Sequence, residues 1–170
     1  MGDDAALIAP RRGPWLLTTD AMVEGTHFSR VWFRPEEVGF KALAANLSDA
    51  AAMGGRPTHA VVSLILPPDT AVAAVQGLYR GMRRLARREQ VPLLGGNLAR
   101  GERISITIGL LGDFPWGPPV TRTGAAIGDR LYVSGQPGTA YLGYRLLAGR
   151  RPARPRPDRN RGGTDPWNPC

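Results

Sequence analysis

The chain has 170 residues, 42% of them hydrophobic, which is enough to build the core of one folded domain. Its longest apolar stretches are too short to span a bilayer, and its only cysteine, Cys170, excludes an intramolecular disulfide. Because the chain begins with Met1-Gly2-Asp3-Asp4 instead of a basic and then apolar signal segment, we expect a cytoplasmic protein without a membrane partner.

The formal net charge of +8 is divided equally between two regions. Residues 1–149 carry 16 basic against 12 acidic side chains, and residues 150–170 carry six against two. The second region has five prolines and no Leu, Ile, Val, Phe or Met, so it cannot bury enough apolar surface to fold. We expect a domain over 1–149 and a disordered Arg/Pro-rich tail over 150–170. Such tails can bind nucleic-acid phosphates, but a solvated extension is more common, and we do not expect a nucleic-acid partner.

The first predicted element is a buried strand over Trp15 to Thr19, which places Asp20 at its C-terminal end. Residues 21–34 have no clean period and predict a loop. A helix then begins at Pro35-Glu36-Glu37, since proline is tolerated at the first helical position and acidic side chains favour the positive end of the helix dipole.

This helix is predicted to end near Met53, before Gly54-Gly55, with Asn46 and Asp49 three residues apart on one face. The rest of the chain predicts further elements in mixed order: strands over 60–66, 91–94, 103–112 and 130–134, and helices over 70–89 and 139–149. We therefore expect an α+β fold with a mixed β-sheet.

Short acidic and glycine-bearing motifs recur along the chain and predict a site for Mg²⁺ and phosphate. Asp4 follows a glycine, Asp20 ends a predicted strand, and Asp49 lies on a predicted helix. Carboxylates gathered from several segments repel one another unless cations compensate, and hard oxygen ligands suit Mg²⁺. Each aspartate alone is more often a surface carboxylate or a cap; the ordered set favours the functional interpretation.

Three further features are candidates for phosphate contacts. Gly95-Gly96 follows an apolar stretch and allows close approach of the backbone to a phosphate, although an ordinary tight turn also fits. His27 follows Asp20 closely and is suited to an anion, although a single histidine is more often structural. Arg122 carries the planar fork that clamps polyphosphates, although loop arginines usually face solvent.

Together the motifs resemble the thiamine-monophosphate kinase family, which belongs to the superfamily of aminoimidazole ribonucleotide synthetase. The resemblance covers residues 2–149 and rests on Gly-Asp-Asp-Ala-Ala, Thr-Thr-Asp, Val-Glu-Gly-Thr-His-Phe, Asn-Leu-Ser-Asp, Gly-Gly-Asn and Arg-Thr-Gly-Ala. It implies an α+β N-terminal domain with helices on one face of a mixed sheet, and a homodimer in which two sheets pair.

The resemblance also implies a reaction and a set of site residues. The reaction transfers the γ-phosphoryl group of ATP to thiamine monophosphate and gives thiamine diphosphate, with Mg²⁺ as cofactor and no residue acting as general acid or base. His27 is the implied substrate contact. The implied metal ligands are Asp4, Thr18, Thr19, Asp20, Asp49 and Asn97. The implied ATP contacts are Gly96, Asn97 and Arg122.

The sequence departs from the family pattern in three places. Asn97 stands where the family usually has aspartate, so one negative charge is lost, and Glu89 stands near the place of an aromatic side chain that often helps to hold the nucleotide. The family also continues before Gly2 and has a second, C-terminal domain after the last helix. We expect this chain to lack that domain, and the Arg/Pro-rich tail suggests a truncated or frameshifted reading frame.

Three alternatives to a kinase remain open at the level of sequence. The first alternative is a non-catalytic fragment that binds nucleotide or dimerises. The second is a nucleic-acid binder that acts through its tail. The third alternative is a member of the same superfamily with a different substrate, for which His27 is the discriminating residue.

Overall fold

The computed structural model describes residues 13–149, so Asp3, Asp4 and the predicted tail lie outside the described residues. Its contacts divide into two units, the first ending at Val120 and the second beginning at Thr121. The first unit contains β1 (Trp15–Val23), α1 (Pro35–Ala52), β2 (Arg56–Leu66), α2 (Val72–Arg88), β3 (Leu93–Arg100) and β4 (Ser105–Asp113). The second contains α3 (Thr139–Gly149). The predicted extent of one domain, 1–149, stays a prediction.

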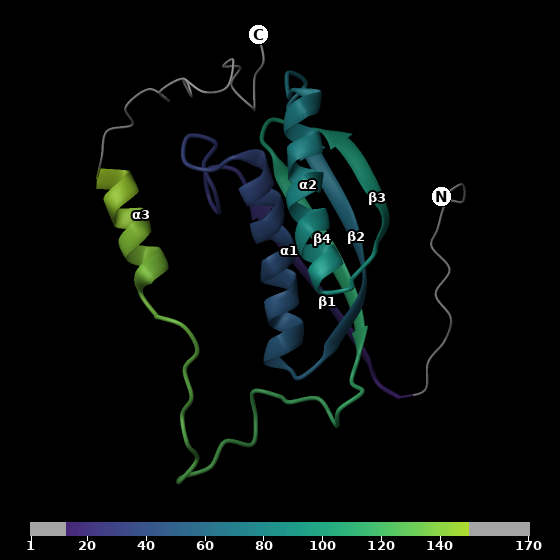
Figure 1. Cartoon of the computed structure of the whole chain (residues 1–170), viewed down its shortest axis with the longest axis vertical. Helices are drawn as coiled ribbons and strands as arrows, with labels where there is room; N and C mark the ends of the chain where they lie inside the picture. Colours follow the sequence, from purple (N-terminus) through teal and green to yellow (C-terminus); the bar gives the residue numbers. More distant parts are fainter. Residues whose placement is uncertain (1–12, 150–170) are drawn as a thin grey trace. The chain divides into compact units, whose positions relative to one another are not determined.

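The first unit is a four-stranded sheet in the order β1-β4-β2-β3. Strand β4 pairs antiparallel with β1 and β2, whereas β2 pairs parallel with β3 through the crossover helix α2. Figure 1 shows α1 and α2 together on one face of this sheet. The predicted α+β fold with a mixed sheet and helices on one face is confirmed.

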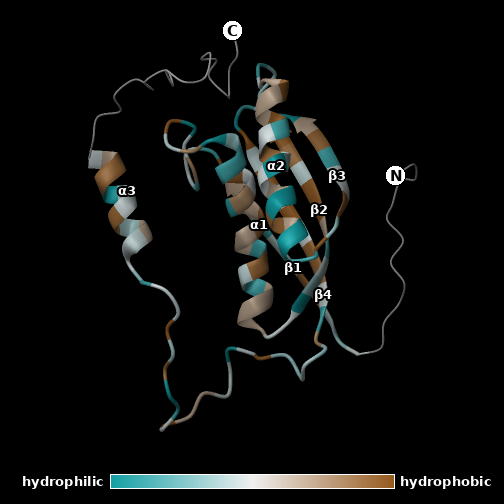
Figure 2. Ribbon diagram, viewed as in Figure 1, coloured by the Kyte–Doolittle hydropathy of each residue, from teal (hydrophilic) through white to brown (hydrophobic). Residues whose placement is uncertain are grey.

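The core lies between the sheet and the two helices. Alternate residues of β4 point to the helices, and Ile106, Ile108 and Leu110 are fully buried there. They meet Leu43 of α1 and Leu78 of α2 in one apolar cluster. Figure 2 shows the hydrophobic residues concentrated on the strands and hydrophilic stretches on α2. Within the described residues, no helix is both long enough and apolar enough to cross a membrane.

Glycines let the backbones of α1 and α2 approach closely. A Cβ added at Gly39 would lie 1.9 Å from the Leu78 carbonyl oxygen, and one at Gly81 would lie 1.9 Å from the Glu36 carbonyl oxygen. The contact is reinforced by an ion pair in which Arg80 Nη2 lies 2.6 Å from Glu36 Oε1. This close packing holds α1, the helix that carries Asn46 and Asp49, against α2.

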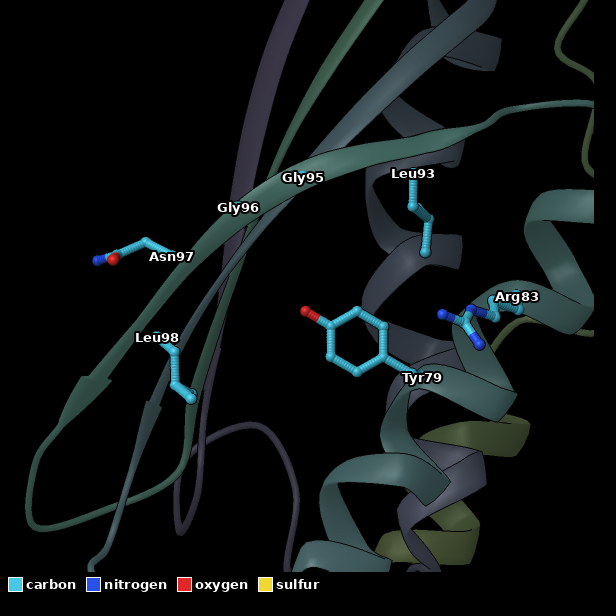
Figure 3. A pocket seen from close by; sticks show the side chains of 7 residues that line it. All are labelled: Tyr79, Arg83, Leu93, Gly95, Gly96, Asn97 and Leu98. Carbon is cyan, nitrogen blue, oxygen red and sulfur yellow. The ribbon is translucent and has the colours of Figure 1, made fainter. Parts of the chain in front are cut away.

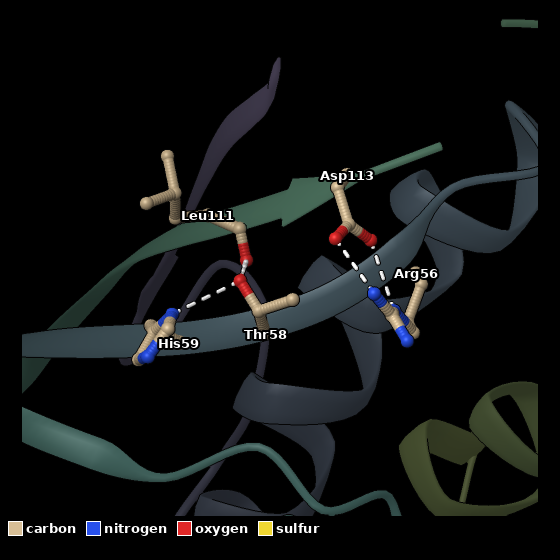
Figure 4. A network of polar contacts seen from close by, with 5 residues as sticks. All are labelled: Arg56, Thr58, His59, Leu111 and Asp113. Carbon is tan, nitrogen blue, oxygen red and sulfur yellow. Dashed lines mark hydrogen bonds and ion pairs between the residues drawn. The ribbon is translucent and has the colours of Figure 1, made fainter. Parts of the chain in front are cut away.

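A second ion pair joins β2 to β4 at the end of the sheet. The Arg56 guanidinium donates to both carboxylate oxygens of Asp113, at 2.9 and 2.7 Å, and Figure 4 shows the two side chains facing each other. The neighbouring Thr58 hydroxyl donates to the Leu111 carbonyl at 3.1 Å. The Asp113 carboxylate raises the pKa of Arg56 through the hydrogen bonds and the opposite charge.

Three predicted elements are wrong in extent or absent. β1 continues to Val23, so Asp20 lies inside the strand rather than at its end, because pairing with β4 extends over the whole segment. β3 runs from Leu93 to Arg100 and includes Gly95-Gly96, whereas the predicted strand was 91–94 and ended before the two glycines. Residues 130–134, predicted as a strand, have no regular structure.

Candidate functional site

The first part of the candidate site lies where β1 runs antiparallel beside α1. Leu16 and Met22 are buried on the helix-facing side of β1, so Thr18 and Asp20 share that side. The Thr18 hydroxyl donates to Asp49 Oδ2 of α1 at 3.2 Å, and both side chains remain partly or fully accessible. We call this contact line the β1–α1 seam and define it by Thr18, Asp20, His27, Lys41, Asn46 and Asp49.

Asn46 holds the middle of the β1–α1 seam rather than facing solvent. Its side chain is 1% exposed, its Oδ1 accepts from the Asp20 backbone N–H at 2.9 Å, and its Nδ2 donates to the Ala42 carbonyl at 3.1 Å. Both halves of the amide are therefore engaged. The sequence predicted that Asn46 and Asp49 face one site, but Asn46 positions the backbone at Asp20 while Asp49 remains available.

The acidic end of the seam carries an electrostatic cost. Asp49 lies in the last turn of α1, where the helix dipole is negative, and that turn contains no basic residue. The Asp20 carboxylate lies on the same side of β1 as Thr18 and accepts from the Ala21 N–H at 2.8 Å. In residues 13–149 no group of three or more His, Cys, Asp or Glu side chains is arranged to hold a metal. The two carboxylates and the Thr18 hydroxyl are nevertheless hard oxygen donors of the kind Mg²⁺ takes with water or phosphate.

His27 lies in a tight loop directly after β1. The Val23 N–H donates to His27 Nδ1 at 3.0 Å, and the His27 and Thr26 amides both donate to the Val23 carbonyl. Lys41 of α1 donates to the His27 carbonyl at 2.6 Å. The structure thus brings the predicted substrate contact to the same seam as Asp20 and Asp49.

Gly96 and Asn97 lie in β3, at the other edge of the sheet from β1. A Cβ added at Gly96 would lie 1.6 Å from the Val62 carbonyl oxygen, so close strand packing alone demands glycine there. Asn97 pairs with Ser63 on the face away from the helices. Three strand spacings, about 14 Å, separate this edge from β1. Within one chain, Asn97 does not join Thr18, Asp20 and Asp49.

A pocket of about 290 Å³ lies between α2 and β3 beside these glycines. Figure 3 shows Tyr79 and Arg83 of α2 facing Leu93 and Leu98 across it, whereas Asn97 points away. Burial raises the pKa of the Tyr79 phenol, and the Arg83 charge opposes that shift. The pocket combines an aromatic face, a cation and an apolar wall.

The other predicted site residues lie elsewhere. Thr19 pairs with Gly109 and points to the sheet face away from Thr18. Arg122 belongs to the unit that begins at Thr121, and Asp4 lies outside the described residues. The roles of all the predicted site residues, including those of the seam, stay predictions. Lys41 was not among the predicted residues, although it is the only lysine in the sequence.

Comparison with known proteins agrees with the predicted resemblance. Residues 2–113 match the family described as AIR synthase related protein, N-terminal domain. The thiamine-monophosphate kinase of Aquifex aeolicus is 40% identical over 147 residues, which cover 86% of this chain and 47% of that protein. The chain therefore spans about half the length of the curated relatives it matches.

Solved structures give the same result. The thiamine-monophosphate kinase of Stenotrophomonas maltophilia K279a superposes with a TM-score of 0.80 at 36% identity, covering 87% of this chain and 46% of that one. The Aquifex aeolicus protein complexed with AMPPCP and TMP superposes with a TM-score of 0.75 at 41% identity, covering 79% and 43%. The resemblance to thiamine-monophosphate kinases predicted from the motifs is confirmed.

Proposed function

The chain belongs to the AIR synthase related family, whose N-terminal domain it matches, and we propose that it is the nucleotide- and metal-binding part of a thiamine-monophosphate kinase. The observation that carries this proposal is the β1–α1 seam, where the Thr18–Asp49 hydrogen bond brings Asp49 to the strand that carries Asp20 and leads into the His27 loop. The similarity to kinases over 86% of this chain supports the same reaction.

In the proposed reaction, an oxygen of the thiamine monophosphate phosphate attacks the γ-phosphorus of ATP. A new P–O bond forms while the bond to the β–γ bridging oxygen breaks, so the products are thiamine diphosphate and ADP. A phosphate nucleophile is largely ionised at neutral pH, so no side chain has to remove a proton. Catalysis then depends on orientation of the two anions and on compensation of their charge.

The seam residues fit Mg²⁺ as the accompanying cation. Thr18, Asp20 and Asp49 would hold it at the C-terminal end of α1, with Asp4 as a further proposed ligand. The Thr19 side chain lies on the other face of the sheet, so the proposed ligand from this residue is its backbone carbonyl. Bound Mg²⁺ neutralises phosphate charge and orients the oxygens of the nucleotide. The chain's own contribution is the rigid spacing of Asp20 from Asp49, which Asn46 fixes through its bond to the Asp20 amide.

We propose that Gly96, Asn97 and Arg122 contact ATP, and that Asn97 reaches the metal site of a partner copy in a homodimer. Within one chain Asn97 lies at the other edge of the sheet and on its other face, so it could complete this metal site only from a second copy. The sheet face away from the helices also exposes large apolar side chains, suited to pairing with a second sheet. These are Leu17, Val61 and Ile65, which are 78%, 45% and 39% exposed. We place this homodimer in the cytoplasm.

A second candidate function is nucleotide binding without turnover. It is favoured by the pocket between α2 and β3, which offers the Tyr79 ring and the Arg83 cation to a ligand away from the seam. Calorimetry distinguishes the two: binding of Mg²⁺-AMPPCP combined with no product from Mg²⁺-ATP and thiamine monophosphate supports the second candidate.

Product analysis tests the proposed function and its substrate. The purified chain is incubated with Mg²⁺, ATP and either thiamine monophosphate, thiamine or an aminoimidazole ribonucleotide precursor. We expect thiamine diphosphate from thiamine monophosphate alone. Turnover with the aminoimidazole substrate instead would assign the chain to another branch of the superfamily.

A further inference from the structure

The basic side chains of this protein are almost all arginine. The sequence contains 22 Lys and Arg residues, and Lys41 is the only lysine among them. We propose that Lys41 and His27 together form the anchor for the phosphate monoester of the acceptor substrate. This inference rests on the proposed kinase function, and it assigns a binding role to Lys41 that the motifs do not.

The Lys41 ammonium is held in place but not saturated. It donates to the His27 carbonyl at 2.6 Å and lies 5.6 Å from the centroid of the Phe33 ring. An ammonium has three donors, so two remain for an anion. Among the described residues no carboxylate forms an ion pair with Lys41, whereas Arg30, Arg56, Arg80 and Arg88 each have one.

The second donor of the anchor comes from the imidazole of His27. Its Nδ1 accepts the Val23 N–H at 3.0 Å, which leaves the proton of the neutral ring on Nε2. The side chain is exposed, so Nε2–H is available to an incoming ligand. Lys41 binds the carbonyl of the same residue, so the two donors come from neighbouring parts of α1 and the loop.

The position of this anchor along α1 matches the proposed transfer. Lys41 and Asp49 are eight residues apart, which corresponds to about 12 Å along the helix axis. The seam is acidic at its Asp49 end, suited to Mg²⁺ with the nucleotide, and cationic at its Lys41 end, suited to a bare phosphate. Lysine fits better than arginine because a compact ammonium can serve one carbonyl and two phosphate oxygens in different directions.

A single lysine makes the first test direct. Growth with ¹³C-labelled lysine gives one Hε–Cε signal, and it is followed by NMR during titration with thiamine monophosphate, phenyl phosphate, thiamine or Mg²⁺-AMPPCP. We expect a saturable shift with the two monoesters and none with thiamine. A shift with Mg²⁺-AMPPCP alone would assign Lys41 to the nucleotide and overturn the inference, as would no shift with either monoester.

Variants separate an anchoring role from a structural one. Lys41→Met is expected to weaken thiamine monophosphate binding at least about tenfold without changing Mg²⁺-AMPPCP affinity, because a charge-assisted hydrogen bond is lost. Lys41→Arg should recover part of the loss. Arg84→Met is the matched control, since Arg84 is also an exposed cation over a ring, 5.1 Å from the Phe40 centroid. Equal loss for both ligands in Lys41→Met would mean a structural role and overturn the inference.

Failure of the inference and failure of the proposed function give different results. If Lys41→Met binds thiamine monophosphate as tightly as the unaltered chain and still forms thiamine diphosphate, the anchor is wrong and the kinase proposal stands. If phenyl phosphate shifts the Lys41 signal while thiamine monophosphate does not bind, the anchor stands and the kinase proposal fails.

Discussion

The Thr18 hydroxyl donates to the Asp49 carboxylate across 3.2 Å, joining the central part of β1 to the last turn of α1. This contact sets a carboxylate at the negative end of a helix, close to a strand that carries Asp20. A carboxylate in this position lowers the stability of the folded chain, and a bound cation would compensate for that cost.

Replacing Asp49 with Asn is expected to stabilise the metal-free protein and to abolish stabilisation by Mg²⁺. Removing a negative charge from the C-terminal turn relieves an unfavourable dipole interaction of about 0.3–1 kcal/mol. Thermal unfolding with and without MgCl₂ measures both effects. Asp69→Asn is the control, because Asp69 is an exposed carboxylate outside the seam and its loss should leave the Mg²⁺ response intact. An unchanged Mg²⁺ response in Asp49→Asn contradicts the assignment.

Replacing Asn46 with Ala is expected to destabilise the fold by about 1–3 kcal/mol, because the part-buried Asp20 amide loses its acceptor and the buried Ala42 carbonyl loses a side-chain donor. Chemical denaturation measures the loss. Ser48→Ala, which removes an exposed hydroxyl bonded only to the Ala45 carbonyl, should stay within about 0.5 kcal/mol of the unaltered protein. Similar stability for the two variants would show that Asn46 does not hold the seam.

Replacing Gly96 with Ala is expected to disrupt pairing of β2 with β3, because the new Cβ would meet the Val62 carbonyl oxygen at 1.6 Å. Circular dichroism and denaturation are the measurements. Gly143→Ala in α3 is the control: its Cβ meets no atom within 4 Å, and alanine favours a helix by about 1 kcal/mol. A Gly96→Ala protein of normal stability with weakened ATP binding would mean that the glycine is needed for the ligand instead.

The stabilisation by the Glu36–Arg80 ion pair, which joins α1 to α2, should depend on pH. Burial alone would raise the pKa of Glu36, but the hydrogen bond and charge of Arg80 outweigh it, so the folded-state pKa is lowered. For a carboxyl whose pKa is lowered on folding, the added stability is present above its unfolded value of 4.5 and is lost as the pH falls through the folded value.

Glu36→Gln should therefore reduce the dependence of the free energy of unfolding on pH below about 4.5, and Arg80→Met should have the same effect. Both side chains are substantially exposed, so screening by solvent keeps the expected effect below about 1 kcal/mol. A double-mutant cycle in urea at pH 7 and pH 3 gives the coupling. Equal coupling at the two pH values would contradict this assignment.

A shared site predicts complementation between two inactive variants. Asp49→Ala damages the seam of its own copy, and Asn97→Ala damages the group that a partner copy provides. Random pairing of equal amounts gives half heterodimers with one intact site each, and so about a quarter of the unaltered activity. Product formation after mixing and refolding measures it. No recovery would place both residues in sites within one chain, against the separation seen here.

The helices were well predicted from sequence because their signals are local. Pro35 with Glu36 and Glu37 marks the start of α1, and the observed helix ends one residue before the predicted Met53. The bond from the Arg34 N–H to the Glu37 carboxylate, at 2.7 Å, is the physical basis of that start.

Strand limits were predicted less well because they depend on partners distant in sequence. Asp20 is a poor strand residue, yet antiparallel pairing with Ile108 keeps it within β1. Gly95-Gly96 is typical of a turn, but parallel pairing with β2 includes both glycines. Asn97 in β3 and Asp20 in β1 lie at opposite edges of the sheet because of the strand order, which no local motif encodes.

The sequence named candidate residues for the site but not the contacts among them. Asn46 and Asp49 were expected on one face, and only the structure shows that Asn46 is buried and binds the Asp20 amide. The Lys41 contact with the His27 carbonyl joins segments 14 residues apart and has no motif of its own. The presence of one lysine in an arginine-rich chain was the available signal.

The measurement that tests the central claim most directly is a coupled ADP-release assay with Mg²⁺, ATP and thiamine monophosphate, run on the unaltered chain and on Asp49→Ala. We predict ADP release that requires thiamine monophosphate and is reduced at least about a hundredfold in the variant, since the carboxylate proposed to bind the cation is gone. Release of ADP at the same rate by Asp49→Ala, or no release by the unaltered folded chain at saturating substrates, would contradict the account.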